Sequence, residues 1–414
     1  MAMASMRRGG VRAAQNSMTT TRRAFLATDA APLKRTALHA DHVALGGRMV
    51  PFCGWDMPVQ YKESIIDTHT HTRTHAGLFD VSHMGQLKLH GRDRVEFMES
   101  LVVGDIKGLA TDNARLSLFT NEQGGIKDDT VITNGADWLY VVVNAGCADK
   151  DLAHIQEHLA RFKASGKEVD LEILSPDYSL VALQGTGDLF RPEAAAVVGE
   201  HIAGGPESLR GLAFMSGRDT RFDSLPVRIT RCGYTGEDGF EISVPTSDAV
   251  TLWRTLLQHT GKVMPVGLAA RDSLRLEAGL CLYGNDITEE TTPIEAGLAW
   301  TIGKRRRAEG GFPGADVILK QIKEGVTRKR VGFVLAEGIA RAHATVHDEK
   351  GELLGEATSG GYGPSLKKAV GMTYLPTALA KNGTPIQVQV RKKFYPATVA
   401  AMPFHPTNYY KPTQ

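Results

Sequence analysis

The pattern of apolar residues changes near residue 303 of this 414-residue chain. Before that point, alternating runs that predict strands are interspersed with periodic runs that predict helices, which indicates an α+β fold rather than a parallel βαβ sheet. After it, short alternating runs separated by glycine-rich or charged turns predict a small β-barrel. A chain of this length is also too long for one core. We therefore expect a separate C-terminal barrel domain, joined to the rest by a hinge within 303–314.

The local patterns predict specific elements. Predicted hairpins pair 116–120 with 130–133 and 226–231 with 240–244, with glycines in each turn supplying the positive φ that tight turns need. The other predicted elements are a strand at 138–143, helices at 148–165, 248–259 and 267–280, and barrel strands at 331–335, 386–390 and 398–402.

Charge is distributed unevenly across the same division. Residues 304–393 carry 17 basic and 8 acidic side chains, a net charge of +9. Residues 29–303 carry 25 basic and 38 acidic side chains, a net charge of −13. This asymmetry favours an acidic partner or ligand on the basic side of the C-terminal domain, with ordinary solvated charge as the alternative. Aromatic residues are not interleaved with the basic clusters, which argues against nucleic-acid binding.

The N-terminus has the composition of a targeting segment. Residues 1–28 contain five arginines, many Ala, Ser and Thr, no acidic residue and no apolar run of the kind found in secretory signals. Such a composition is typical of an organelle transit peptide. Elsewhere, no run approaches the roughly 18 apolar residues of a membrane-spanning helix. The four cysteines include no CxxC pair, so we expect free thiols in a reducing compartment.

Familiar catalytic motifs are missing. The sequence contains no GxSxG, HExxH, dinucleotide-binding fingerprint or phosphate loop, so catalysis by a protein nucleophile and nicotinamide chemistry are disfavoured. His69 and His71, with His75 nearby, could ligate a metal. Because no parallel strand precedes them, a polar, solvated helix over 63–75 is the favoured interpretation.

Charged residues at three places in the sequence have patterns that suit a ligand cavity. Asp128 and Asp129 enter a predicted strand, whose alternation allows one of the two carboxylates to face a cavity and orient a nitrogen or act as a general base. Alternation also places Glu241 on one face of its strand, where it could accept both hydrogen bonds of an N–H/NH₂ edge such as that of a pterin or guanine. Arg271 lies early in a predicted helix and could engage a ligand oxygen. For the Asp128–Asp129 pair the alternative is a solvated acid in a turn. For Glu241 it is a solvent-facing acid on an edge strand, and for Arg271 it is a surface ion pair.

In combination, these segments resemble the glycine cleavage T-protein family of aminomethyltransferases. The resemblance runs nearly continuously from residue 36 to residue 410 and is densest at 79–84, 99–106, 116–129, 144–147, 230–245, 267–287, 291–304, 358–368 and 402–410. It implies three domains in a clover-leaf arrangement. Two α/β folate-binding subdomains would lie within 36–303, and a C-terminal β-barrel domain would occupy 304–410.

The resemblance also implies a reaction and roles for residues. The one-carbon unit of the S-aminomethyl-dihydrolipoyl group on H-protein would pass to tetrahydrofolate, giving 5,10-methylenetetrahydrofolate, ammonia and dihydrolipoyl H-protein in glycine catabolism. Asp129 matches the key acid near the folate nitrogens, Glu241 and Arg271 match pterin-binding residues, and Tyr409 matches a C-terminal folate contact. Asn144 and Met84 match secondary cavity residues.

Further expectations follow from the same resemblance. Tetrahydrofolate would be a co-substrate, no metal would be needed, and lipoylated H-protein would be the main partner, with looser contacts to the P- and L-proteins. Neither nucleic acid nor a membrane would be bound, and residues 1–28 would direct the chain to the mitochondrial matrix. The alternative is a folate-binding non-transferase involved in iron–sulfur assembly or RNA modification. The Lys-Gly-Cys-Tyr-x-Gly-Gln motif of those proteins is replaced here by Leu-Cys-Leu-Tyr-Gly-Asn at 280–285.

Overall fold

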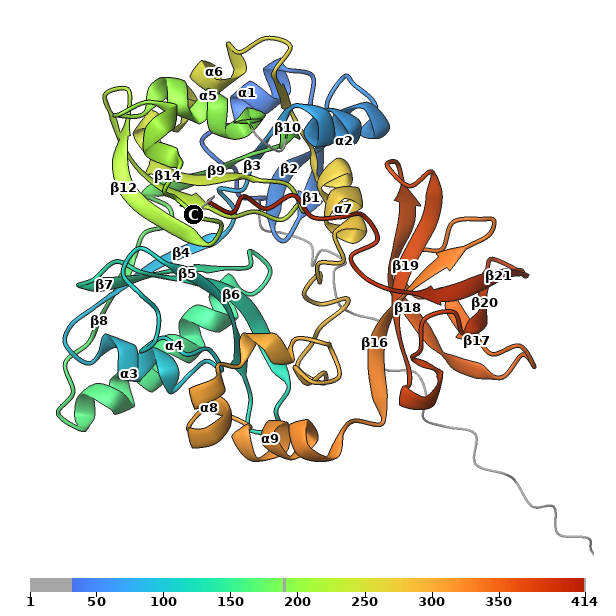
Figure 1. The fold of residues 1–414 in the computed structure, drawn as a ribbon. Coiled ribbons are helices and arrows are strands. Elements are labelled where there is room, and N and C mark those ends of the chain that lie inside the picture. Colours follow the sequence, from blue (N-terminus) through green and yellow to red (C-terminus); the bar gives the residue numbers. More distant parts are fainter. Residues whose placement is uncertain (1–31, 189–190, 413–414) are drawn as a thin grey trace, which may run out of the picture.

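The computed structural model describes residues 32–188 and 191–412, which form three bodies around a common centre (Figure 1). One is built on a six-stranded sheet, one on a five-stranded sheet, and the third is a closed six-stranded barrel. This arrangement confirms the predicted fold class. The predicted transit peptide, 1–28, lies outside the described residues. Within the described ranges, no helix combines the length and apolar character needed to cross a bilayer.

The six-stranded sheet belongs to the first body and is antiparallel except for one pair, β3 with β15. In spatial order its strands are β12 (Ser216–Phe222), β13 (Leu225–Arg231), β14 (Gly239–Pro245), β9 (Tyr178–Gln184), β3 (Ala76–Asp80) and β15 (Val263–Pro265). The helices of this body are α1 (His39–Ala44), α2 (Ile65–Thr74), α5 (Glu193–His201), α6 (Ala249–Leu257) and α7 (Leu268–Glu277). A short ribbon, β1 (Arg48–Phe52) with β2 (Trp55–Gln60), and the two-residue pair β10 (Gly187–Asp188) and β11 (Arg191–Pro192) complete it. The predicted hairpin of 226–231 with 240–244 is confirmed as β13 and β14, and two predicted helices correspond to α6 and α7.

The five-stranded sheet is antiparallel, with the spatial order β5 (Ala114–Thr120), β6 (Ile126–Asn134), β7 (Trp138–Val143), β4 (Gly85–His90) and β8 (Asp170–Ile173). Helices α3 (Arg94–Glu99) and α4 (Ala148–Ala164) pack against it through a shared apolar core. The predicted strand 138–143 and helix 148–165 are both confirmed, as is the hairpin, although β5 and β6 are longer than predicted. In the hairpin turn, Gly124 has φ +79°, and a Cβ on Gly125 would lie 1.7 Å from the Glu289 carbonyl oxygen, so both positions need glycine.

The barrel closes in the order β16 (Arg328–Leu335), β19 (Lys368–Pro376), β18 (Leu353–Gly363), β17 (Thr345–His347), β20 (Pro385–Val390) and β21 (Lys393–Ala400). The predicted strands at 331–335 and 386–390 lie within β16 and β20, while 398–402 overlaps only the end of β21. The stretch 303–314, predicted as a hinge, contains helix α8 (Lys304–Glu309) and leads into α9 (Ala315–Glu324). Ile318 of α9 packs in one apolar cluster with Leu118 and Ile126 of the five-stranded sheet, so these helices tie the barrel to that body.

The chain after β21 returns from the barrel to the six-stranded body, ending beside β12 and β14 (Figure 1). Backbone hydrogen bonds fix its course: the Phe404 and His405 amides both donate to the Glu277 carbonyl, and the Asn408 amide donates to Gly236. The C-terminal tail, residues 401–412, therefore crosses the region between the bodies.

Candidate functional site

A cavity of about 900 Å³ lies between the three bodies. Its lining comes from both sheets, from helix α7, from the connection that follows α7, from β16 and from the C-terminal tail. All four residues singled out by the sequence line it: Asp129, Glu241, Arg271 and Tyr409. A volume of this size suits a ligand with the dimensions of a cofactor.

Asp129 reaches the cavity from β6. Asp128, its neighbour, has no exposed surface and does not line the cavity, as strand alternation predicts for consecutive residues. Burial, and after it the nearby charge of Asp128, raise the pKa of Asp129 to about 7, against the lowering effects of the hydrogen bond from Asn144 and the charge of Arg271. A carboxyl group that titrates near neutral pH can exchange a proton with a ligand nitrogen.

Asn144 links the two neighbouring acids. Its Nδ2 donates to Oδ1 of Asp128 and to Oδ1 of Asp129, each at 2.9 Å, and its backbone amide donates to Oδ2 of Asp128 at 3.0 Å. The Asn144 amide thus holds the Asp129 carboxylate in one orientation. Asn144 is itself held by Asp128, on the opposite face of the strand.

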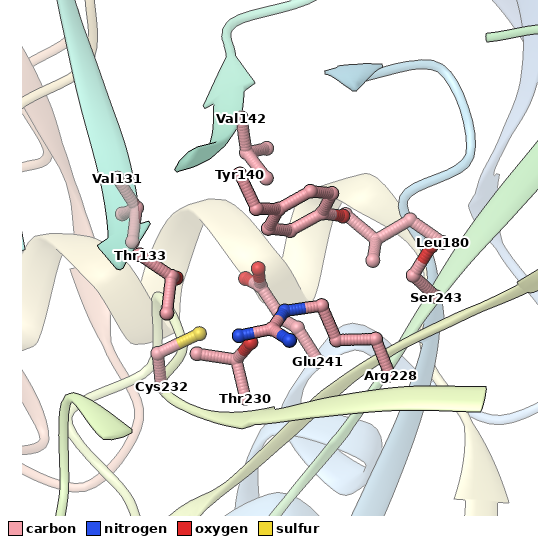
Figure 2. Close-up of a pocket in the computed structure, with 10 residues that line it drawn as sticks. All are labelled: Val131, Thr133, Tyr140, Val142, Leu180, Arg228, Thr230, Cys232, Glu241 and Ser243. Carbon is pink, nitrogen blue, oxygen red and sulfur yellow. The ribbon is translucent and has the colours of Figure 1, made fainter. Parts of the chain in front are cut away.

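Glu241 lies on the floor of the cavity in β14, which pairs with β13 on one side and β9 on the other. The alternative of a solvated acid on an edge strand is therefore wrong. Burial raises the pKa of Glu241, opposed by a hydrogen bond with Cys232 and by the charge of Arg271. A small extension of the floor, of about 10 Å³, lies beside it, and Figure 2 shows Glu241, Arg228 and Thr133 pointing into that space.

Arg228 brings positive charge to this floor. Its guanidinium group donates to Asp219 at 2.9 Å and lies 4.5 Å from the ring centroid of Trp138 and 5.5 Å from that of Tyr140. The two rings belong to β7 and Arg228 to β13, so this contact also joins the two sheets beneath the cavity.

Arg271 projects from α7 over the ring of Tyr234, 4.5 Å from its centroid. Within the described residues it makes no ion pair, whereas Arg275, one turn on, is paired with Asp272 and Asp286. The alternative that Arg271 forms a surface ion pair is therefore wrong. Its charge lowers the pKa of both Asp129 and Glu241, which favours their ionised forms.

Tyr409 completes the wall from the C-terminal tail. Its ring stacks on Phe214, with centroids 3.9 Å apart and an angle of 17° between the planes. Next to it, Asn408 Nδ2 donates to Glu237 at 2.9 Å. Burial raises the pKa of Tyr409 to about 12, so the phenol is neutral at physiological pH.

Of the other residues that line the cavity, some were expected from the sequence and some were not. Met84 and Asn144 were expected as secondary cavity residues, and both line it. Arg115, Tyr234, Trp300 and the Phe214 that stacks on Tyr409 were missed. They come from loops, a strand end and a short 3₁₀ turn whose local sequence carries no periodic signal, and only the tertiary arrangement brings them together.

The histidine-rich segment forms helix α2, which begins with a capping box between Ser64 and Asp67. The helix was predicted, but its solvated character was wrong on the face that holds Thr68, His69 and Thr72, which are buried. His69 has no exposed surface and its ring lies within hydrogen-bond distance of Ser273, Glu277 and Ser365, because α2 packs on α7. His71 instead stacks on His75, with centroids 4.7 Å apart, so the three imidazoles do not converge on one point.

Comparisons with known proteins agree with this architecture. The model of the GCVT N-terminal domain matches residues 38–306, and that of the glycine cleavage T-protein C-terminal barrel domain matches residues 328–405. Proteins described as "Aminomethyltransferase, mitochondrial" are 53% identical over 384 residues in Flaveria anomala, covering 92% of each chain, and 52% identical over 380 residues in Homo sapiens, covering 91% of each. The crystal structure of glycine cleavage system aminomethyltransferase T from Bartonella henselae has a TM-score of 0.83 and 41% identity, covering 92% of this chain and 100% of that one.

Proposed function

The chain belongs to the glycine cleavage T-protein family, and on that premise we propose that it is a mitochondrial aminomethyltransferase of the glycine cleavage system. The enzyme is a tetrahydrofolate-dependent transferase. One observation about the site carries the assignment of residues: the cavity between the three bodies is lined at once by Asp129, Glu241, Arg271 and Tyr409. We further propose that residues 36–303 are the folate-binding region, with one subdomain on each sheet, and that residues 304–410 are the barrel domain.

The residues on the floor and wall of the cavity have the properties of a folate site. Glu241 offers two acceptor oxygens to the N–H/NH₂ edge of the pterin, and Arg271 favours its ionised form. The stacked rings of Tyr409 and Phe214 offer an apolar wall to the aromatic part of the ligand. Asp129 would then lie beside the reactive folate nitrogens.

The transfer requires proton movement rather than a protein nucleophile. The carbon of the S-aminomethyl group exchanges its bonds to nitrogen and sulfur for bonds to two folate nitrogens. Those nitrogens lose two protons, which end on ammonia and on the released thiol. In this proposal the Asp129 carboxylate, with its pKa of about 7, orients a folate nitrogen and accepts its proton. Folate supplies the nucleophile and the lipoyl arm the electrophile, so the proposal includes no resident metal.

The carrier of the aminomethyl group is proposed to be lipoylated H-protein, delivered to the same cavity. Residues 1–28 would bring the chain to the mitochondrial matrix, where this system works. A folate-binding role without transfer, as in iron–sulfur assembly or RNA modification, is not favoured, because relatives about 50% identical over nearly the whole chain are described as aminomethyltransferases.

A single turnover assay tests the function. The purified chain is mixed with aminomethyl-loaded H-protein and tetrahydrofolate, and ammonia and methylenetetrahydrofolate are measured. We expect both products in equal amounts, dependent on folate. Release of neither product, with folate binding intact, would contradict transfer and support the non-transferase alternative.

A further inference from the structure

Behind Asp129, on the opposite face of β6, lies a buried cluster that the proposed reaction does not use. It consists of Asp128, Cys147 and Asp151, and one carboxylate oxygen of each aspartate and the sulfur of Cys147 lie within 4.8 Å of one another. Their exposed fractions are 0%, 3% and 1%. Asp151 comes from the first turn of α4, which packs over the sheet at this point.

Among the described residues, no cation neutralises this pair of acids. Asp128 accepts hydrogen bonds from the backbone and side-chain amides of Asn144, while both oxygens of Asp151 lack a donor within the described ranges. The ammonium group of Lys150 is directed elsewhere, to the Lys127 carbonyl at 2.6 Å and to Tyr283 and Glu289 at 2.9 and 3.0 Å.

Two enclosed carboxylates at this separation cannot both be ionised, because each loses its hydration and repels the other. Burial first, and then the charge of Asp128, raise the pKa of Asp151, only partly opposed by Lys150 and Lys127. The proton belongs on Asp151, since Asp128 has two N–H donors that stabilise its anion and Asp151 has none.

We infer that Asp128 and Asp151 share a single proton, carried by Asp151, and that the ionised Asp128 is a positioning residue that orients Asn144 toward Asp129. The expected effect of this positioning on turnover rests on the proposed function, whereas the inference of a shared proton does not depend on it.

The chemistry of an amide explains how this would work. Only the nitrogen end of the Asn144 side chain can donate to a carboxylate, and its two hydrogens are used by Asp128 and Asp129. If Asp128 were protonated, its hydroxyl could bond to the amide oxygen instead, and the amide would be free to turn over. A fixed negative charge on Asp128 removes that alternative.

The same charge acts on Asp129 directly, because it helps to raise the pKa of that carboxyl toward neutrality. On the cavity side, Asp129 is faced by Arg271, Tyr234 and Cys281. Of these, Arg271 has the opposite effect and lowers its pKa. Asp128 therefore contributes both orientation and electrostatic tuning to the carboxyl that faces the ligand.

A measurement without substrate tests the shared proton. The infrared carboxyl band of the full chain is compared between wild type, Asp151→Asn and Asp149→Asn, the last being an exposed acid on the same helix. We expect a protonated-carboxyl band that persists from mildly acidic to mildly alkaline buffer in wild type and in D149N, and that is lost in D151N. Its absence from wild type would overturn the inference, as would stoichiometric binding of Zn²⁺ to the three ligands in place of the proton.

Turnover then tests the positioning role. Asp128→Asn removes the like charge, so we expect the pH profile of turnover to move to lower pH by about one unit or more, with a reduced maximum. Asp151→Ala should lose roughly tenfold or more in kcat, while Asp151→Asn, which can still donate to Asp128, should restore most of it. An unchanged pH profile in D128N, or equal losses in D151A and D151N, would overturn the positioning role. If wild type shows no turnover, the proposed function fails while the infrared result still decides the shared proton.

Discussion

Asn144 donates through Nδ2 to the Asp129 carboxylate at 2.9 Å. This hydrogen bond links the carboxyl group at the cavity wall to the buried acid cluster behind β6. Its donor is shared with Asp128, also at 2.9 Å, which places one amide between two acids that are adjacent in sequence and on opposite faces of the strand. The hydrogen bond lowers the pKa of Asp129 against the effect of burial. The reactivity of Asp129 should therefore depend on a residue that itself carries no charge.

Asn144→Leu removes this donor and keeps the branched shape of the side chain. Without the hydrogen bond, the pKa of Asp129 should rise above about 7, because the anion loses a stabilising partner. Turnover that depends on ionised Asp129 rises with pH through that pKa, so its rising limb should move to higher pH, opposite to the shift expected for D128N. Steady-state rates across pH measure the shift, and a limb that stayed in place would argue against Asn144 as a determinant of Asp129.

Asp129→Asn should retain tetrahydrofolate binding and lose most turnover. The amide keeps the shape of the side chain but cannot accept the folate proton, and a positioned acid or base contributes typically 10²–10⁴-fold. Calorimetry reports the affinity and the ammonia assay reports the rate. A D129N enzyme with near wild-type turnover would remove Asp129 from the reaction.

Glu241→Ala should weaken folate binding more than it slows the chemistry of bound folate. A hydrogen bond to a charged group contributes about 1.5–3 kcal/mol, which corresponds to roughly 10- to 100-fold in Kd. Glu172→Gln, at an exposed acid of strand β8, is the matched control and should leave Kd unchanged. Equal folate affinities in wild type and E241A would contradict the pterin contact.

Tyr409 should act through its ring rather than its hydroxyl. Tyr409→Phe keeps the stack on Phe214, whereas Tyr409→Ala removes it, and aromatic pairs contribute about 0.5–1.5 kcal/mol beyond the area they bury. We expect folate affinity to fall several-fold in Y409A and to stay close to wild type in Y409F. A loss of equal size in both variants would point to the hydroxyl instead.

The first body should depend strongly on one buried ion pair. Arg231 donates to Asp238 through Nε at 2.9 Å and Nη2 at 2.6 Å, with exposed fractions of 2% and 0%. Asp238→Ala leaves a buried arginine uncompensated, which typically costs about 3–5 kcal/mol. Thermal unfolding should show a clear decrease in Tm, while Glu157→Gln, at an exposed helical pair, should have little effect.

The sequence predicted those features that depend on neighbouring residues. The alternation that separates Asp128 from Asp129 is local to one strand, and strand β7 and helix α4 follow from their own periodicity. The position of Glu241 on a central strand was not predictable this way, because β14 is enclosed by β9, which lies far away in the sequence. The burial of His69 and the stacking of Tyr409 on Phe214 likewise depend on how separate elements pack. Asp129, Glu241, Arg271 and Tyr409 were chosen together only through the family resemblance.

The most direct test of the central claim is a crystal structure of this chain with bound tetrahydrofolate. We predict the pterin edge against Glu241, the ring system beside Tyr409, and the Asp129 carboxylate within hydrogen-bond distance of a folate nitrogen. Folate bound outside the cavity, or Asp129 turned away from it, would contradict the account.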